Sequence, residues 1–419
     1  MTSRTSRRDI MTAGLGAAAW AAGAGRAQAQ SQGELSVRLE LPGRALLFRQ
    51  SEARNLGEFV GPAYVQQCFL AARNDAPFSV FFRPDKGSER VEVVVELGRV
   101  FGPANAAAAS IGGYRATISR GDTVLAQVDV PKHNWFGRWR WQSAPRPIAV
   151  SPAELAAVGL IPPYKAGVIR LRGSGQWPGY TIMGTAGVAT YMPTTGERDD
   201  IGLLTEPQAE YVITGGAAAR AAMMAQAEAS GSVPWHMRDE NAGGPVNFER
   251  HPNVFWRNEG NVKIAKTDWE IDTAHQPALT YLPYLLTGDP YYLEALQFAC
   301  AWNFGMNSPE YRNYKDCVLG AYPYSDVGQS RAFGWSIRTL AYATRATPES
   351  VPAWLLPRAY WKTKLDANRA WFTMRFVENK AGMYRTFRST ASPWYIPAEG
   401  AAYPGNTSID PWQDYYQGA

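Results

Sequence analysis

The chain has 419 residues, of which 46% are hydrophobic and 19% are charged, and its formal net charge is +5 at pH 7. The first 29 residues hold four arginines and one aspartate, so they carry three of those five positive charges. The rest of the chain is nearly neutral and has no run of lysine or arginine. This balance argues against nucleic acid or an anionic membrane surface as a partner.

The N-terminus resembles a twin-arginine export signal over residues 1–29. Arg7 and Arg8 precede a stretch rich in Ala and Gly at 11–25, and a small-x-small cleavage site follows at 27–29. The alternative is an ordinary secretory leader that holds two arginines by chance. Either leader predicts a mature protein in the periplasm or outside a bacterial cell. No later segment reaches the ~18 continuous apolar residues of a membrane span, so none is expected.

The next part of the chain, residues 30–200, has the pattern of an antiparallel β-sandwich domain. Glu34–Leu41 alternates polar and apolar residues, as a half-buried strand does. Gly121 and Asp122 form a turn signal between two such runs. A short helix is predicted at Ser151–Val158. The other predicted strands are Phe78–Phe82, Val91–Leu97, Tyr114–Ser119, Thr123–Val130, Val168–Leu171 and Tyr180–Met183.

Tryptophans alternate along the segment 135–141. In a strand, Trp139 and its tryptophan neighbours share one face, and Arg138 and Arg140 occupy the other. One interpretation is a platform on which sugar rings stack, which makes Trp139 a candidate substrate-binding residue. The other interpretation is a strand whose indoles fill the sandwich core or its border with the next domain.

Residues 201–419 have the pattern of helices joined in pairs. Thr205 starts a capping box before a helix that breaks at Thr214 and Gly215. A second helix is predicted over Ala217–Ala229. These two helices form the first predicted pair.

The clearest pair lies within 268–304. Thr273 is expected to cap a helix that ends before Gly288, which suits the left-handed C′ position. Asp289 then caps a second helix, with Pro290 at its first position, where a missing N–H costs nothing. The third predicted pair is Gln329–Ala343 with Pro348–Val377.

Two motifs mark these helices: His-x-Pro-x-Leu-x-Tyr at 275–281 and Leu-x-Thr-Gly-Asp-x-x-Tyr-Leu at 285–293. Together with an export leader and a β-sandwich, they resemble the (α/α)-toroid, or six-hairpin, superfamily of carbohydrate-active proteins over roughly residues 200–419. A full toroid needs about six hairpins and three are visible, so the resemblance implies a partial toroid. The segment 408–416 reads as the start of another helix.

The resemblance also implies a function. It predicts an exported protein that cleaves the glycosidic bonds of a polysaccharide, as a glycoside hydrolase or a polysaccharide lyase. Two alternatives stay open: a non-catalytic glycan-binding or envelope-associated protein, and an interaction solenoid without a sugar ligand. A polysaccharide or oligosaccharide is therefore the expected partner.

Two polar clusters lie on predicted loops of the helical half, where catalytic residues are often carried. We expect them to share one rim of the toroid. They comprise Trp235, His236, Arg238, Asp239 and Glu240 in the first cluster, and Asp272, His275 and Tyr281 in the second.

A hydrolase needs two carboxyl groups, one to protonate the glycosidic oxygen and one to activate water. Asp239 or Glu240 can fill one of these roles and Asp272 the other. In this interpretation Trp235 lies beside the carboxylates and binds the sugar.

A lyase needs a base and a cation. His236, His275 or Tyr281 can remove the proton next to a uronate carboxyl. Arg238 or Arg331 can neutralise that carboxyl.

Each candidate also has a structural interpretation. Arg331 and Trp335 are helical neighbours that suit a sugar carboxylate and ring, or simple packing between helices. Asp272 can be a helix cap, His275 a near-core imidazole, and the 238–239 pair a loop ion pair.

The three cysteines, Cys68, Cys300 and Cys317, are odd in number and match no metal-binding spacing. Cys300 and Cys317 either pair in an oxidising compartment or stay reduced. The sequence has no zinc motif, phosphate-binding loop, dinucleotide fingerprint or Gly-x-Ser-x-Gly elbow. No metal and no cofactor is therefore expected.

Overall fold

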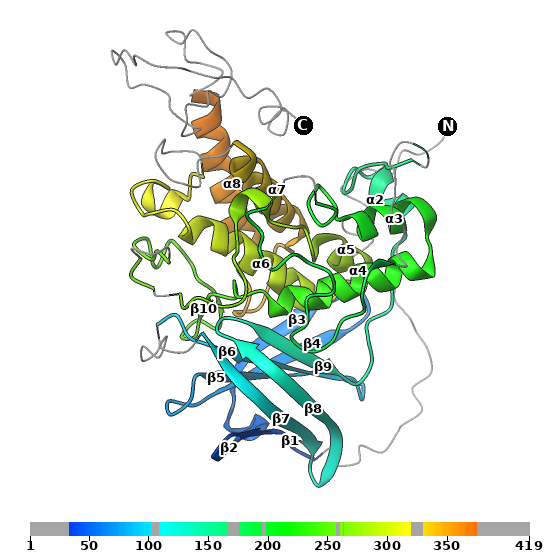
Figure 1. Cartoon of the computed structure of the whole chain (residues 1–419), viewed down its shortest axis with the longest axis vertical. Coiled ribbons are helices and arrows are strands. Elements are labelled where there is room, and N and C mark those ends of the chain that lie inside the picture. The colour runs from blue at the N-terminus through cyan, green and yellow to red at the C-terminus, as the bar shows by residue number, and fades with distance from the viewer. Residues whose placement is uncertain are drawn as a thin grey trace.

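The computed structural model describes residues 33–101, 109–165, 167, 176–194, 198–256, 260–262, 264–319 and 330–374. The predicted leader, the predicted strand Val168–Leu171 and the segment 408–416 lie outside these residues. The described chain begins with antiparallel sheets and continues with helices, and Figure 1 shows the strands gathered at one end of the molecule and the helices at the other.

Within the described residues, nine strands of the first part form two antiparallel sheets. The first sheet has the order β2-β1-β7-β8 and the second β3-β4-β5-β6-β9. The strands are β1 (Leu35–Leu41), β2 (Arg44–Arg49), β3 (Arg54–Val60), β4 (Val65–Ala72), β5 (Phe78–Pro84), β6 (Val91–Leu97), β7 (Ser110–Arg120), β8 (Thr123–Asn134) and β9 (Arg138–Gln142).

Several strand predictions are confirmed. In β1, Leu35, Val37 and Leu39 are buried and alternate with more exposed residues, as predicted. The turn at Gly121 is confirmed too, since Gly121 has φ 56° and joins β7 to β8. The predicted strand Tyr180–Met183 is wrong.

A hydrogen-bonded turn replaces that strand. The N–H of Gly184 donates to the Thr181 carbonyl at 2.7 Å, and Met183 has a left-handed φ of 60°. Both features are incompatible with an extended strand, in which φ is negative.

A hydrogen-bond chain joins the two sheets around Trp139. The Trp139 indole N–H donates to the Tyr114 hydroxyl at 2.8 Å, and that hydroxyl donates to His133 Nδ1 at 2.8 Å. His133 Nε2–H in turn donates to the Gly137 carbonyl at 2.9 Å. Trp139 is 0% exposed. The core interpretation of this tryptophan therefore fits, and the ring offers no face on which a sugar could stack.

The helices of the second part pair in chain order, as α3 with α4, α5 with α6 and α7 with α8. Gly215 and Gly288 end α3 and α5 in the left-handed conformation, and Asp289 caps α6, as predicted. The helices are α2 (Pro152–Ala157), α3 (Glu206–Thr214), α4 (Ala217–Ala229), α5 (Tyr281–Thr287), α6 (Pro290–Gly305), α7 (Ser330–Ala346) and α8 (Arg358–Phe372), and a small ribbon joins β10 (Arg238–Asp239) to β11 (Gly244–Pro245).

Two predicted helix starts are wrong. The helix after Thr205 begins where predicted, at Glu206, although Thr205 makes no side-chain capping bond. Asp272, not Thr273, caps a 3-10 turn, η4 (Thr273–His275), and α5 begins only at Tyr281. Pro277 explains the delay, because a proline disfavours helical backbone in the residue before it.

Prolines also explain why α8 begins later than predicted. The prediction placed it at Pro348, but α8 begins at Arg358. Pro352 and Pro357 lie between these positions, and each lacks the N–H that a helix interior requires. The connection from α7 therefore runs without helix until Pro357 precedes the first turn of α8.

Buried ion pairs join the second sheet to α6 and to β10. Glu294 of α6 accepts from Arg83 at 2.8 Å, from Arg138 at 2.5 Å and from Arg238 at 2.6 Å. Burial alone would raise the pKa of Glu294, but the three guanidinium groups hold that pKa well below its usual range. We call the whole set the arginine–glutamate network; its members are Arg83, Arg138, Arg140, Arg238, Glu92, Glu96, Asp289 and Glu294.

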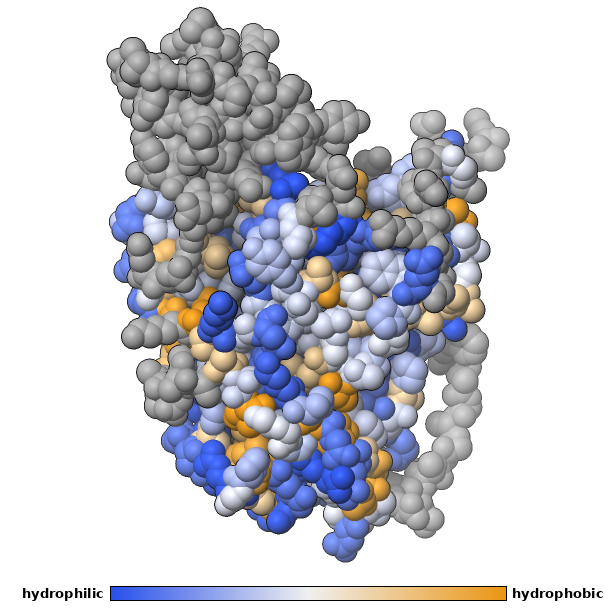
Figure 2. Space-filling model, viewed as in Figure 1, coloured by the Kyte–Doolittle hydropathy of each residue, from blue (hydrophilic) through white to orange (hydrophobic). Residues whose placement is uncertain are grey.

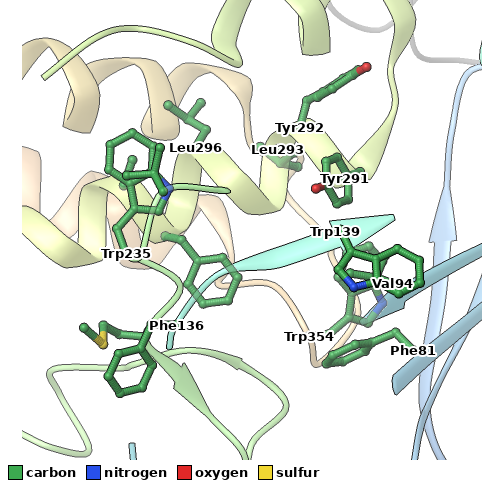
Figure 3. Close-up of a cluster of buried hydrophobic side chains, with 14 of the residues drawn as sticks. Phe81, Val94, Phe136, Trp139, Trp235, Tyr291, Tyr292, Leu293, Leu296 and Trp354 are labelled. Carbon is green, nitrogen blue, oxygen red and sulfur yellow. The ribbon is translucent and has the colours of Figure 1, made fainter. Parts of the chain in front are cut away.

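The eight named members carry four arginines and four carboxylates, and the less buried Glu228 and Arg90 add one charge of each sign at the edge of the network. Arg138 and Arg140 follow the alternation of β9 and face α6, opposite Trp139. Figure 3 shows aromatic side chains of the sheet and of α6 gathered in this region. The side chains of the network are buried, so its charges are an interior feature. On the face drawn in Figure 2, hydrophilic and hydrophobic residues are mixed.

Candidate active site

The residues just before α5 form a compact polar cluster, which we call the Asp272–His275 cluster. Asp272 accepts a hydrogen bond from the N–H of Ala274 at 3.2 Å and so holds the 3-10 turn that presents His275. The second oxygen of the same carboxylate contacts Nδ1 of His275. The Asp272 side chain keeps about a quarter of its surface exposed (24%), whereas the His275 side chain is buried.

An arginine on α7 completes the cluster. Nη2 of Arg331 lies 2.6 Å from Nε2 of His275. A guanidinium can only donate, so Nε2 must accept and the ring proton must sit on Nδ1, which donates it to Asp272. The arrangement leaves a basic lone pair on the side of the ring that faces the cation.

A polar belt around Gln276 holds this turn in place. Gln276 and Asn303 exchange two side-chain hydrogen bonds of 3.0 Å. The hydroxyl of Thr339 donates to the side-chain oxygen Oε1 of Gln276 at 3.0 Å. Arg198 donates to the His275 backbone carbonyl at 3.1 Å. Elements distant in sequence therefore converge on His275, the last residue of the 3-10 turn, and on Gln276, which follows it.

A pocket of about 600 Å³ lies beside the cluster. Glu270 and Ile271, which directly precede Asp272, line it. Trp302, on α6 next to the Asn303 that binds Gln276, lines it as well. The pocket and the Asp272–His275 cluster therefore lie at the same end of α6. The remaining lining residues are Pro234, Trp256, Ile264, Ala265, Lys266, Thr267, Trp269 and Met306.

Asp239 of the first predicted cluster forms a second His–Asp pair with His251, which lies outside that cluster in the sequence. His251 Nε2 lies 3.0 Å from Asp239 Oδ2, and its ring lies 4.2 Å from that of Phe101. The other oxygen of Asp239 accepts the N–H groups of residues 241 and 242 at 3.0 Å, which is the pattern of a capped turn. Burial raises the pKa of the neighbouring Glu240. Asp239, which contacts His251, therefore organises the turn at residues 239–242. The neighbouring Glu240 carboxyl binds a proton more readily than an ordinary glutamate does.

Trp235 and His236 of the same cluster lie in the core, 1% and 3% exposed. Nδ1 of His236 faces the carbonyls of Phe136 and Val233 at 3.1 and 3.0 Å, and its ring meets Phe298 edge-on. Burial, assisted by the charge of Arg138, holds the pKa of His236 well below its usual range. His236 is thus a neutral core imidazole at neutral pH.

Three other candidates have internal partners. Arg238 belongs to the arginine–glutamate network, where Glu96 and Glu294 take its guanidinium. The Tyr281 hydroxyl donates to the Leu160 carbonyl at 2.9 Å, and burial raises its pKa above the usual range. Trp335 is 6% exposed and carries the guanidinium of Arg338 over its ring at 4.7 Å.

The contacts separate the two predicted clusters. Arg238 binds Glu294 near the start of α6, whereas Gln276 binds Asn303 near its end. Nine residues of helix correspond to about 13 Å. The two predicted clusters therefore contact α6 at different points along its length.

Sequence reasoning missed His251 and the pocket tryptophans Trp256, Trp269 and Trp302. His251 carries no local signal, because its partner Asp239 lies twelve positions away on a turn. Two of the tryptophans stack in space, Trp256 on Trp302 at 6.1 Å, but lie 46 positions apart in the chain. Only Trp269 lies within the 268–275 segment, so it alone carried a sequence signal for the pocket.

The cysteines are free thiols in this structure, including Cys300 and Cys317, and all three are buried. Burial raises the pKa of Cys317 to about 12, so its thiol stays protonated near neutral pH. In the described part of the chain, no group of three or more His, Cys, Asp or Glu side chains has the geometry of a metal site. Among the same residues, no helix is both long and apolar enough to cross a membrane.

Comparison of the chain with models of protein families, with curated proteins and with solved structures gave no match. The geometry of the sites described above is therefore the basis for the functional argument.

Proposed function

We propose that the protein is an exported carbohydrate-active enzyme that cleaves an acidic polysaccharide by β-elimination, as a polysaccharide lyase. The observation that carries the proposal is the alignment of Asp272, His275 and Arg331 next to a tryptophan-lined pocket. The wider setting is part of the proposal: the two sheets act as a β-sandwich, and the helix pairs as part of an (α/α) toroid. The leader-like N-terminus supports export to the periplasm or beyond.

The chemistry needs a base and a cation within reach of one sugar. In β-elimination a base removes the proton next to a uronate carboxyl, a carbon–carbon double bond forms, and the bond to the leaving sugar oxygen breaks while that oxygen gains a proton. His275 has its lone pair on Nε2 and can take the first proton. Asp272 holds the tautomer and stabilises the imidazolium that results. Arg331 can pair with the carboxylate and so acidify the adjacent C–H.

Arg331 and His275 also couple binding to catalysis. Before substrate binds, the guanidinium lies 2.6 Å from Nε2 and competes for the lone pair. A uronate carboxylate is a stronger partner for a guanidinium than a neutral imidazole is, because both members of that pair are charged. When substrate binds, its carboxylate pairs with Arg331, and Nε2 of His275 is then free to accept a proton.

The hydrolase alternative has weaker support, because Asp239 and Asp272 contact different parts of the fold. A non-catalytic glycan-binding protein is the second candidate, favoured by one observation. His275 is 3% exposed and its lone pair is already engaged, an arrangement that suits a pocket built to hold sugar without reacting with it.

A polysaccharide panel tests the proposal. The purified full chain is incubated with neutral and uronic polysaccharides, and the products are followed by the ultraviolet absorbance of unsaturated uronate and by reducing ends. We expect both signals with an acidic polymer. Reducing ends without absorbance would mean hydrolysis, and no product on any polymer would leave the binding function.

His251→Ala is the matched control for His275→Ala. Both histidines pair with an aspartate, but only His275 also faces an arginine. Loss of a general base costs roughly 10²–10⁴-fold in rate. We expect that loss for His275→Ala and near wild-type cleavage for His251→Ala, and equal losses would contradict the assignment.

A further inference from the structure

The pocket beside the Asp272–His275 cluster has aromatic walls held by the fold. Trp256 and Trp302 stack with 28° between their rings, and the Trp256 indole N–H donates to the Trp302 carbonyl at 3.2 Å. The Trp302 indole N–H, by contrast, has no hydrogen-bond partner among the described residues. The walls thus combine apolar ring surface with a polar group that no described protein atom satisfies.

A rigid turn carries the charged rim of this pocket. Thr267 Oγ1 accepts the N–H of Trp269 at 3.0 Å and donates to the Trp269 carbonyl at 3.2 Å. The turn fixes the backbone between the two exposed residues Lys266 and Glu270, which both line the pocket. Its geometry therefore sets where the Lys266 side chain starts.

The Lys266 ammonium has no carboxylate within 4.0 Å in the described part of the chain. The nearest acidic residue in sequence, Asp268, is already engaged: Lys132 lies 3.2 Å from it and Asn134 donates to it at 2.8 Å. The carboxylate of Glu270 lines the same pocket, but among the described residues it forms no ion pair with Lys266. An ammonium group that makes no such ion pair, beside aromatic walls, can pair with an anionic ligand.

The spacing to the catalytic cluster is short. Glu270 lies in a β-bridge with Tyr191, and Asp272 has extended φ and ψ of −135° and 137°. Two extended residues cover about 7 Å. The edge of the pocket at Glu270 is therefore about one sugar step from Asp272, so this edge and the cluster suit neighbouring residues of one polymer.

We infer that Lys266 is a specificity-determining residue that binds an acidic group on the sugar next to the one cleaved. The inference rests on the proposed function and deepens it: the preferred substrate carries acidic groups on adjacent sugar residues. The sugar in the pocket contacts the small exposed part of the tryptophan walls, of which Trp269 is 6% and Trp302 3% exposed, while its carboxylate pairs with Lys266. A polymer with isolated acidic residues leaves Lys266 without a partner and binds more weakly.

Binding is measured separately from cleavage, on the His275→Ala chain, so that turnover does not consume the probe. The probes are oligogalacturonate and the same oligosaccharide with its carboxyl groups reduced. We expect Lys266→Gln to weaken oligogalacturonate binding about 3–5-fold, the range of a partly exposed ion pair. Lys266→Arg is expected to retain most of the affinity, and the reduced probe is expected to show no difference between the variants.

Lys86→Gln is the matched control, because it removes the same charge from an exposed lysine in the sheet half, paired with Glu58. We expect it to leave binding unchanged. Equal affinity of Lys266→Gln and the parent, or no binding of oligogalacturonate at all, overturns the inference. The proposed function fails independently if wild-type chain cleaves no polymer while binding still depends on Lys266. If the chain cleaves acidic polymer but Lys266→Gln does not change KM, the proposed function stands and only the inference about Lys266 is wrong.

Discussion

The arginine–glutamate network and the Asp272–His275 cluster use the same kinds of residue in opposite ways. In the network each carboxylate meets guanidinium groups, the charges balance, and Glu294 is fully buried. In the cluster Arg331 donates to the imidazole of His275, and the carboxylate of Asp272 is partly exposed. A buried ion pair holds two parts of a fold together, whereas a partly exposed acid–imidazole pair remains accessible to a ligand.

The comparison predicts that damage to the network costs stability first. Glu294→Ala leaves three buried guanidinium groups around an empty position, and breaking a buried ion pair typically costs about 3–5 kcal/mol. Urea unfolding of the purified chain measures this loss. Glu349→Ala, which removes an exposed partner of Arg358, is the control and should shift the midpoint little. Equal midpoints for Glu294→Ala and wild type would contradict a stabilising network.

As the pH falls, protonation of the buried histidines should destabilise the chain at a higher pH than protonation of the network carboxylates does. Burial lowers the pKa of His133 to about 4, below the 6.5 of an unfolded histidine. Between these values the unfolded state binds more protons, so the free energy of unfolding falls as the pH drops from 6.5 to 4. The total for this one group is about 3 kcal/mol. His236 has a lowered pKa as well and adds to the fall.

Glu294 acts in a lower window. Its folded pKa is depressed, so its contribution is complete above about 4.3 and is lost as the pH falls below that value. Urea unfolding at a series of pH values separates the two windows. His133→Gln should flatten the dependence between pH 6.5 and 4, and an unchanged slope in that variant would show that His133 is not responsible.

Damage to the cluster should cost activity and spare stability. Asp272→Asn keeps the size of the side chain but removes the charge that fixes the His275 tautomer. We expect cleavage to fall by roughly 10²-fold, the lower end for disabling a general base, with little change in the urea midpoint. Rates on the best polymer of the panel, with unfolding curves beside them, check both halves. A large fall in stability would make Asp272 a structural residue like those of the network.

We expect the smallest loss of stability from changes at the glycines that end α3 and α5. Gly215 and Gly288 both end helices with φ near 65°, but only Gly288 meets another segment, since an added Cβ would lie 3.0 Å from Pro62. Gly215→Ala should cost about 1 kcal/mol from backbone strain alone, and Gly288→Ala more. Thermal or urea unfolding of the two variants measures the difference. Equal costs would mean that the Pro62 segment yields freely.

Much of the fold could be predicted from local signals. The alternation of Leu35–Leu41 and the helix Ala217–Ala229 needed only the period of the pattern and the glycine at the helix boundary. The order of strands followed by paired helices came from the same signals. Where the prediction failed, at Tyr281 and Arg358, prolines inside the apolar pattern had been given too little weight.

The candidate site could be predicted only in part. Asp272 and His275 were recognisable because they lie three positions apart and a turn can bring them together. Arg331 was a candidate too, but its contact with His275 could not be predicted, since nothing local connects it to a histidine 56 positions earlier. Arg238 was assigned to substrate because its two glutamates lie on other elements. Burial and long-range pairing decide between such roles, and neither is encoded in the spacing of neighbouring residues.

The sequence by itself determined the types of element, their caps and turns, and the residue kinds that gather before α5. Those depend on interactions within a few positions of the chain, where periodicity and backbone preference suffice. Tertiary structure alone decided which arginines form buried ion pairs and which core tryptophans also line a pocket. The reason is that desolvation and charge compensation depend on partners brought together by the whole fold, so the same side chain can stabilise in one place and bind in another.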